Sequence, residues 1–358
     1  MDFTLDDEQL ALRDAVRGLL KGYDPSVDAE RRRSVTAEDP GYDEQVWARL
    51  AEMGALGLPF AEQDGGMGAG PVEVAVVAEE IGRVLAPEPY VASVVLAGGL
   101  VAAAGSDDQR AELLGALSSG ELLLTCARVD PALGDAGTVA EPVIQGARAD
   151  KIVWQVGHEL FVSDRPEGVE GYHTPDGGRA ARLVFDRSRA TPLGDGGDAS
   201  ETIALARARA QVAACHEALG AMDTALRMTT SYLTTRKQFG VTLNHFQALN
   251  FRAADCYTSL ELTRSMVTWA TMVAAEHDDP TAVVEAAARA KLQTARAARH
   301  VGQEAIQLHG GIGMTAEYAV GHYTARLTAL NHWLGAADEQ LTRLSGGLTD
   351  HGVLDPLS

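Results

Sequence analysis

The chain has 358 residues, of which 46% are hydrophobic and 22% are charged, and its formal net charge is −20. This composition is typical of a globular protein with a large core, and the length suggests two or three structural units. The negative charge disfavours binding to nucleic acids or to anionic membranes, so any polyanionic ligand must meet a local group of basic residues.

The cysteines and the N-terminus both indicate a cytoplasmic protein. Cys126, Cys215 and Cys256 are far apart and form no CxxC pair, so we expect buried free thiols and neither disulfides nor a metal site. The first 20 residues are acidic and lack the continuous apolar core of a signal peptide. The most apolar stretch, 90–105, contains glycines and is too short to span a bilayer.

Residues 1–122 are expected to form an N-terminal helical domain. Apolar residues recur at helical spacing between Leu5 and Leu20, where Asp6 and Gln9 have the spacing of a capping box. A turn-rich stretch, PFAEQDGGMGAG, interrupts the helical pattern at 59–70. Further helices are predicted for residues 43–53, 72–84 and 106–117.

Residues 123–200 are expected to form a small middle β-domain. The segment consists of short runs rich in β-forming residues and broken by glycine, proline and aspartate. These runs are LLLTCARV, VAEPVI, KIVWQV, ELFVS and RLVFD. The glycine-rich loop LGDGGDAS at 193–200 ends the domain.

Residues 201–358 are expected to form a C-terminal four-helix bundle, which makes the fold mainly α. The pattern changes here to long helices joined by short links, as in bundles. The helices are predicted for residues 204–235, 246–276, 281–308 and 319–344. Apolar faces of the second and third of these helices are expected to pack against a partner subunit.

Two strings in the C-terminal half are specific. They are RKQFG at 236–240, followed by NHFQALN at 244–250, and QLHGGIGMTAEY at 307–318. Taken alone, Arg236 is equally consistent with a cation at a helix C-terminus, and Gly310 and Gly311 with a helix cap. His309, between apolar residues, is expected to be a packed core histidine.

Together, and in this order on a helical background, the strings resemble the acyl-CoA dehydrogenase family. The strings LAEMGALGLPFAEQDGGMG at 50–68 and MDFTLDDEQ at the N-terminus resemble it as well. The resemblance implies the fold order of helices, small β-domain and helix bundle. It also implies FAD as cofactor and α,β-dehydrogenation of an acyl-CoA thioester as the reaction.

The resemblance assigns FAD contacts to both strings. In the family they contact the adenosine and pyrophosphate half of an FAD that a neighbouring subunit mainly holds. An arginine fork suits phosphate oxygens, amides donate hydrogen bonds, and glycines let the backbone approach the ligand. The residues that match are Arg236, Gln238, Phe239, Gln247, Gln307, Gly310 and Gly311.

The family's catalytic glutamate has no counterpart in this chain. Removing the α-proton of a thioester requires a positioned carboxylate. Ungapped alignment from MTAEY places Leu334 at the usual position, and counting back from RKQFG places Ala210 at the alternative position. Neither side chain accepts a proton. Asp338 and Glu339 lie one turn beyond the first position and Glu217 two turns beyond the second, too far for direct transfer at about 5.4 Å per turn.

The middle domain also departs from the family, which holds the flavin ring there. The nearest match to the family's ring-binding string is CARVDPALGD at 126–135, which keeps Asp130 and Pro131 in outline. Trp154 has two interpretations, a flavin-stacking aromatic or a core tryptophan, and the second is favoured. We infer that the chain's own flavin-ring pocket is eroded.

Three functional hypotheses follow. The first is a non-catalytic subunit that donates the adenosine half-site to a second acyl-CoA dehydrogenase subunit carrying the glutamate. It resembles the non-catalytic member of the α2β2 enzymes that degrade steroid side chains in actinobacteria. The second is a self-sufficient homo-oligomer with a relocated base, and the third a non-enzymatic helical assembly protein. For the enzymatic hypotheses, acyl-CoA is the expected substrate and electron-transfer flavoprotein the expected electron acceptor.

Overall fold

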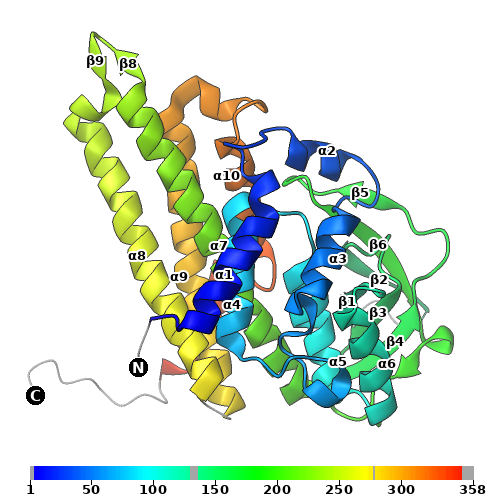
Figure 1. Cartoon of the computed structure of the whole chain (residues 1–358). Coiled ribbons are helices and arrows are strands. Elements are labelled where there is room, and N and C mark those ends of the chain that lie inside the picture. The colour runs from blue at the N-terminus through cyan, green and yellow to red at the C-terminus, as the bar shows by residue number, and fades with distance from the viewer. Residues whose placement is uncertain (1–3, 130–135, 277–278, 349–358) are drawn as a thin grey trace, which may run out of the picture.

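The computed structural model describes residues 4–129, 136–276 and 279–348 and has the expected order of helices, β-structure and helix bundle (Figure 1). The N-terminal helices include α1 (Asp7–Leu20), which begins with the predicted Asp6–Gln9 capping box. Short helix α2 (Arg31–Ala37) was not predicted, because its only signal is a run of arginines. The other α-helices of this part are α3 (Glu44–Glu52), α4 (Pro71–Val84), α5 (Gly99–Ala104) and α6 (Asp107–Ser118).

The apolar stretch after α4 forms a π-helix, η4 (Val91–Gly98), that continues into α5. All eight η4 residues are buried, and η4 packs against α7 and the first β-strand. Burial from both sides explains why the stretch is hydrophobic all round. In the ranges that the structure describes, no helix is long and apolar enough to cross a membrane.

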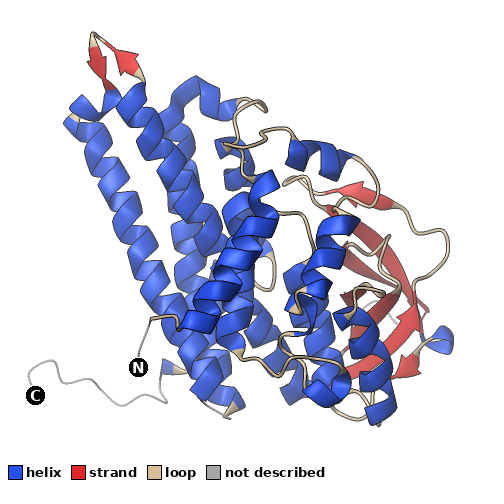
Figure 2. Cartoon of the chain, viewed as in Figure 1, coloured by secondary structure: helices blue, strands red, loops and turns tan. Residues whose placement is uncertain are grey.

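The β-structure between α6 and α7 consists of two small sheets beside the helices (Figure 2). One sheet has the order β1-β3-β4-β7, with β1 parallel to β3 and the other pairs antiparallel. The other is antiparallel, with the order β2-β6-β5. The strands β5 and β7 are two or three residues long, too short to show periodicity in the sequence. The strands are β1 (Leu124–Val129), β2 (Ala136–Ile144), β3 (Lys151–Val156), β4 (Glu159–Asp164), β5 (Gly171–His173), β6 (Arg179–Asp186) and β7 (Thr191–Pro192).

The bundle is built from α7 (Ser200–Thr235), α8 (Gln247–Glu276), α9 (Pro280–His309) and α10 (Val320–His332). The prediction of one last helix over 319–344 is wrong, because α10 stops at His332 and α11 (Ala337–Gly346) begins after a break. Leu334 and Gly335 have φ angles of 61° and 108° there, which a right-handed helix does not allow. Gly335 and the acidic first turn of α11 were the available sequence signals.

Helices α4 and α7 cross with their backbones in contact, at one glycine on each. A Cβ added to Gly82 would overlap the main-chain carbonyl of Glu217, and one added to Gly220 would overlap that of Glu79. The one glycine within α7 is therefore required by the close approach of α4 rather than by backbone flexibility. This contact fixes the N-terminal helices on the bundle.

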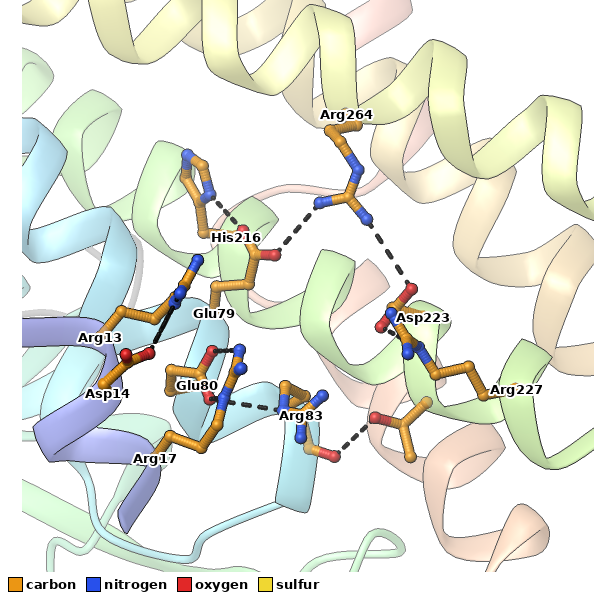
Figure 3. Close-up of polar contacts among 11 residues, drawn as sticks. Arg13, Asp14, Arg17, Glu79, Glu80, Arg83, His216, Asp223, Arg227 and Arg264 are labelled. Carbon is orange, nitrogen blue, oxygen red and sulfur yellow. Dashed lines mark hydrogen bonds and ion pairs between the residues drawn. The ribbon is translucent and has the colours of Figure 1, made fainter. Parts of the chain in front are cut away.

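A polar network reinforces this contact between α1, α4, α7 and α8 (Figure 3). The Glu79 carboxylate lies 3.3 Å from His216 Nδ1 and 3.1 Å from Arg264 Nη1. Its neighbour Glu80 lies 2.6 Å from Arg17 Nη2 on α1. Burial alone would raise the pKa of Glu79, but His216 and Arg264 hold it below its ordinary value.

A buried carboxyl lies in the loop between α4 and η4. Glu88 Oε1 accepts hydrogen bonds from the Tyr23 hydroxyl at 2.7 Å and from the Asp43 amide at 3.3 Å. Its Oε2 has no partner among the described residues. Burial, opposed by these hydrogen bonds, raises the pKa of Glu88 to about 7.

Glu88 makes stability fall as pH rises. Its folded-state pKa is above the ordinary value, so its contribution is complete below that value and is lost as pH rises through about 7. The shift corresponds to about 3 kcal/mol at most. We expect Glu88→Gln to remove this fall in the free energy of unfolding, measured by urea denaturation between mildly acidic and mildly alkaline pH. The exposed control Glu62→Gln should keep it; an unchanged pH profile in Glu88→Gln would contradict the assignment.

Candidate functional site

The RKQFG string forms a hairpin at the end of α7 (Figure 1). Strands β8 (Lys237–Gln238) and β9 (Val241–Thr242) pair around a two-residue turn. Phe239 and Gly240 both have positive φ angles, 52° and 85°, as the tightest right-twisting hairpins require. The turn leaves the Phe239 side chain 92% exposed, and Arg236 and Gln238 are exposed beside it.

The second string ends α9 and forms the 3-10 helix η8 (Gly310–Met314). Gly310 has a φ of 65°, which favours glycine, and Gly313 is packed against Ile306 and His309. Gly311 differs from both, since its φ is not positive and a Cβ there would meet nothing within 4 Å. Nothing within this chain requires glycine at 311, whereas a ligand approaching from outside would.

His309 joins the two strings. Its ring is buried and lies 4.6 Å from the Tyr232 ring, one turn before Arg236, and 5.0 Å from the Tyr318 ring. The Nδ1 atom lies 2.7 Å from the Ala305 carbonyl, and burial lowers the pKa of His309. The prediction of a packed core histidine is confirmed.

The seven residues assigned to FAD lie at one end of the bundle. Four belong to the hairpin and to the first residue of α8, and three to the end of α9 and the start of η8. All seven are exposed: Arg236, Gln238, Phe239, Gln247, Gln307, Gly310 and Gly311. Their role in binding FAD stays a prediction.

The outer surface of α8 is partly apolar, with Phe251, Tyr257 and Leu262 about 60% exposed. This agrees with the expectation of a partner-facing surface on that helix. For α9 the expectation is wrong, because its apolar residues are buried within this chain's own bundle against α7, α8 and α10. Its exposed positions are mostly polar, such as Arg296, Arg299 and Gln303.

The two segments that carry the expected positions of the missing base lie in contact. Gln211, next to Ala210 on α7, donates a hydrogen bond from Nε2 to the Leu334 carbonyl at 2.7 Å. Ala210 and Leu334 are both buried. The loop between α10 and α11 therefore lies against α7 beside Gln211. The assignment of Leu334 and Ala210 to the family's base positions stays a prediction.

The nearby carboxylates, Glu217, Asp338 and Glu339, differ in whether they are free to accept a proton. Glu217 is buried and lies 2.6 Å from Arg326 Nη2, and the Arg326 Nη1 atom lies 2.8 Å from Asp176. Burial would lower the pKa of Arg326, but these two carboxylates raise it, so the guanidinium stays charged. Glu217 is therefore held in an ion pair with Arg326. Asp338 is exposed, and Glu339 lines a cavity together with Gln211.

Trp154 belongs to the core of the β-domain. Its side chain is 1% exposed, its Nε1 donates to Ser163 Oγ at 2.9 Å, and its ring lies 5.2 Å from Phe185. The core interpretation is confirmed, and Trp154 is not available to stack on a flavin. Asp130 and Pro131 lie outside the described residues. All three cysteines are free, with Cys215 and Cys256 buried and Cys126 partly buried.

Comparison with known proteins identifies the family. The model of the acyl-CoA dehydrogenase N-terminal domain matches residues 6–121, and that of the C-terminal domain matches residues 194–348. The chain is 31% identical to the acyl-CoA dehydrogenase IpdE2 of Mycobacterium tuberculosis over 340 residues, 94% of this chain and 96% of that protein. The chain therefore belongs to the acyl-CoA dehydrogenase family, a family of flavoprotein oxidoreductases whose cofactor is FAD.

Two solved structures are similar over nearly the whole chain. A chain in a variant of the Tcur3481–Tcur3483 steroid ACAD has 28% identity and a TM-score of 0.84, covering 97% of this chain and 99% of that one. A chain in the ChsE4–ChsE5 complex from Mycobacterium tuberculosis has 25% identity and a TM-score of 0.84, covering 99% and 100%. Both structures are named as pairs of different proteins.

The residues present fit one half of FAD better than the other. An exposed arginine, exposed amides, an exposed aromatic ring and an unhindered glycine suit the pyrophosphate and adenosine. For the flavin ring, the tryptophan of the β-domain is buried in its core. Leu334 and Ala210, which the resemblance assigns to the base positions, carry no group that accepts a proton, and that assignment stays a prediction.

Proposed function

We propose that this chain is a non-catalytic subunit of a heteromeric acyl-CoA dehydrogenase. It supplies the half-site for the adenosine and pyrophosphate of an FAD whose ring is held by a catalytic partner subunit. The partner carries the glutamate that removes the α-proton of the acyl-CoA, and the bound flavin accepts the hydride. Electron-transfer flavoprotein is the expected electron acceptor.

The observation that carries the proposal is the contact between Gln211 and Leu334. It joins the two segments to which the resemblance assigns the family's alternative bases, and neither Leu334 nor Ala210 has a group that accepts a proton. A relocated Glu217 is disfavoured because that carboxylate is buried in an ion pair with Arg326. Without a base in reach, the chain lacks the group on which proton abstraction depends.

The half-site is supported by the exposed end of the bundle. Arg236 and Lys237 make no ion pair with any described residue, although the protein carries a net charge of −20. An exposed aromatic ring at a strained turn and a glycine with open space beside it are explained together by a ligand from another chain. The names of two similar structures, each a pair of different proteins, support a heteromeric partner. The name of the first supports a steroid-derived acyl group as the substrate.

One observation favours a second candidate, a self-sufficient enzyme with Glu339 as base. Glu339 lines the same cavity as Gln211, which contacts Leu334, whereas Glu217 is not among the residues that line this cavity. The Glu339 side chain belongs to the exposed first turn of α11. A third possibility, a helical protein without FAD, leaves the exposed hairpin and Gly311 without an explanation.

Arg236→Ala is expected to weaken FAD retention by the complex co-expressed with its partner subunit. Losing a hydrogen bond from a charged group costs about 1.5–3 kcal/mol, which is roughly 10–150-fold in affinity. FAD dissociation is measured by recovery of flavin fluorescence during dilution. The control Arg189→Ala removes an exposed arginine of the β-domain and should retain FAD normally. Equal FAD affinity in both variants would count against the half-site.

Glu217→Gln and Glu339→Gln are expected to leave catalysis nearly unchanged. A general base typically contributes about 10²–10⁴-fold in rate, so loss of the true base is easily seen. The measurement is flavin bleaching by acyl-CoA in a single turnover of the FAD-loaded complex. Replacement of the partner's glutamate should abolish bleaching. If Glu339→Gln abolishes it while FAD stays bound, the chain carries its own base and the second candidate is correct.

A further inference from the structure

A small cavity of about 130 Å³ lies at the end of the β-domain where β2 ends and β6 begins. Among the described residues, those of the helix bundle take no part in its lining, which comes from the β-domain and the loop between α2 and α3. Part of the lining immediately precedes β3, whereas the cavity beside Gln211 includes the turn at the opposite end of that strand. The lining residues are Asp39, Pro40, Gln145, Ala147, Arg148, Val169, Gly171, Arg179 and Ala180.

Gln145 places an unmet acceptor in the wall of this cavity. The residue is 4% exposed, and its Oε1 is buried without a hydrogen-bond partner among the described residues. Its backbone is fixed, because its amide donates to the Arg179 carbonyl at 2.9 Å and its carbonyl accepts from the Arg148 amide at 2.8 Å. The φ angle of 56° lies in the left-handed region, which favours glycine. A use for the side chain would explain why a glutamine stands there.

Arg179 places an unmet donor in the same wall. Its Nη2 donates to the carbonyls of Ala37 and Glu38 at 3.0 and 2.9 Å, which holds the guanidinium in place. Its stem packs over Gly41, where an added Cβ would overlap the arginine Cγ. The Nε atom is buried and has no acceptor within the part of the chain that the structure describes. A cation with a buried free N–H group is stabilised by an anionic acceptor.

The charges around the cavity favour a ligand with one negative charge. Arg148 and Asp39 are both partly exposed and form an ion pair with each other, so their charges cancel. No carboxylate in the described ranges pairs with Arg179, whose hydrogen bonds go to main-chain carbonyls. The cavity therefore carries one uncompensated positive charge in a protein with a net charge of −20. Such a local positive charge is needed for a protein of this overall charge to hold an anion.

We propose that this cavity binds a small hydroxycarboxylic acid as its monoanion. The carboxylate accepts a hydrogen bond from Arg179 Nε, and the hydroxyl donates one to Gln145 Oε1. A water molecule takes ~30 Å³ in the liquid, so a volume of about 130 Å³ admits a ligand of only a few non-hydrogen atoms. That size excludes nucleotides and acyl-CoA. The site is separate from the proposed FAD half-site and requires neither a flavin nor a partner subunit.

The test is a ligand titration of the full chain, or of its complex with the partner subunit, followed by saturation-transfer NMR. The probes are glycolate, acetate, which lacks the hydroxyl, and ethylene glycol, which lacks the carboxylate. Ligands this small are expected to bind in the micromolar range or more weakly. Glycolate should bind at least ~10-fold more tightly than ethylene glycol, because it gains a hydrogen bond from a charged group. It should bind about 2–10-fold more tightly than acetate, because it gains a neutral hydrogen bond.

Matched variants assign the two contacts. Gln145→Leu should reduce the affinity for glycolate to that for acetate and leave acetate binding unchanged. Arg179→Gln should weaken both acids at least ~10-fold. The control Gln155→Leu removes an amide near the other end of β3 and should change neither. Arg179 also holds two main-chain carbonyls, so thermal unfolding of its variant is measured; if that variant does not fold, the comparison of glycolate with acetate in Gln145→Leu decides alone.

Three results would overturn the inference. One is no saturable binding of glycolate even well above millimolar concentration, which would mean that the cavity holds only water. Another is an equal affinity for glycolate and acetate in the unaltered chain. The third is competition of FAD or acyl-CoA with glycolate, which would make the cavity part of the cofactor or substrate site. FAD retention by the complex that carries Gln145→Leu is measured in parallel, so the inference can fail while the proposed half-site stands.

Discussion

Helix α7 packs against α4, α8, α9, α10 and η4, so it lies at the centre of the helical packing. Its backbone contact with α4 fixes how the N-terminal helices sit on the bundle. The contact is possible because Gly82 and Gly220 face the main chain of the opposite helix. Any larger residue would force the helices apart in a core where misplaced volume costs about 1–3 kcal/mol. The Glu79–His216 contact joins these same two helices, while Arg264 links Glu79 to α8 and Arg17 links Glu80 to α1 (Figure 3).

The position of α7 determines where the functional groups stand. Its first turns line the cavity with Arg207, its middle holds Ala210 and Gln211 against the α10–α11 loop, and its end leads into the hairpin with Arg236. One helix therefore connects a cavity, the segment that the resemblance assigns to the alternative base, and the proposed cofactor half-site. The apolar side chains of Ala210 and Leu334 are compatible with tight burial, whereas a carboxylate at either residue would need a partner.

The sequence predicted the long helices well because their ends carry strong signals. Asp6 and Gln9 form the expected capping box, Ser106 caps α6, and Asp279 and Pro280 start α9. The last helix was predicted as continuous because its helical pattern runs across the break. Two left-handed backbone positions interrupt it, and Leu334 gives no local sign of that conformation.

The candidate site was predictable only in part. The resemblance named the exposed residues of the hairpin and of the glycine-rich loop, but their approach through Tyr232 and His309 depends on tertiary packing. Counting along the sequence gave Leu334 and Ala210, and the fold adds the hydrogen bond that joins the two segments. The cavity between α7, α11 and the β3–β4 turn was not predicted, because no local motif marks it.

The most direct test of the central claim is the number of FAD molecules in the purified complex of this chain with its catalytic partner. Flavin absorbance after denaturation, compared with protein concentration from amino-acid analysis, gives the ratio. If this chain contributes only an adenosine half-site, the complex holds one FAD for every two chains, one of each kind. One FAD for every chain would mean that this chain also holds a flavin ring, and would contradict the account.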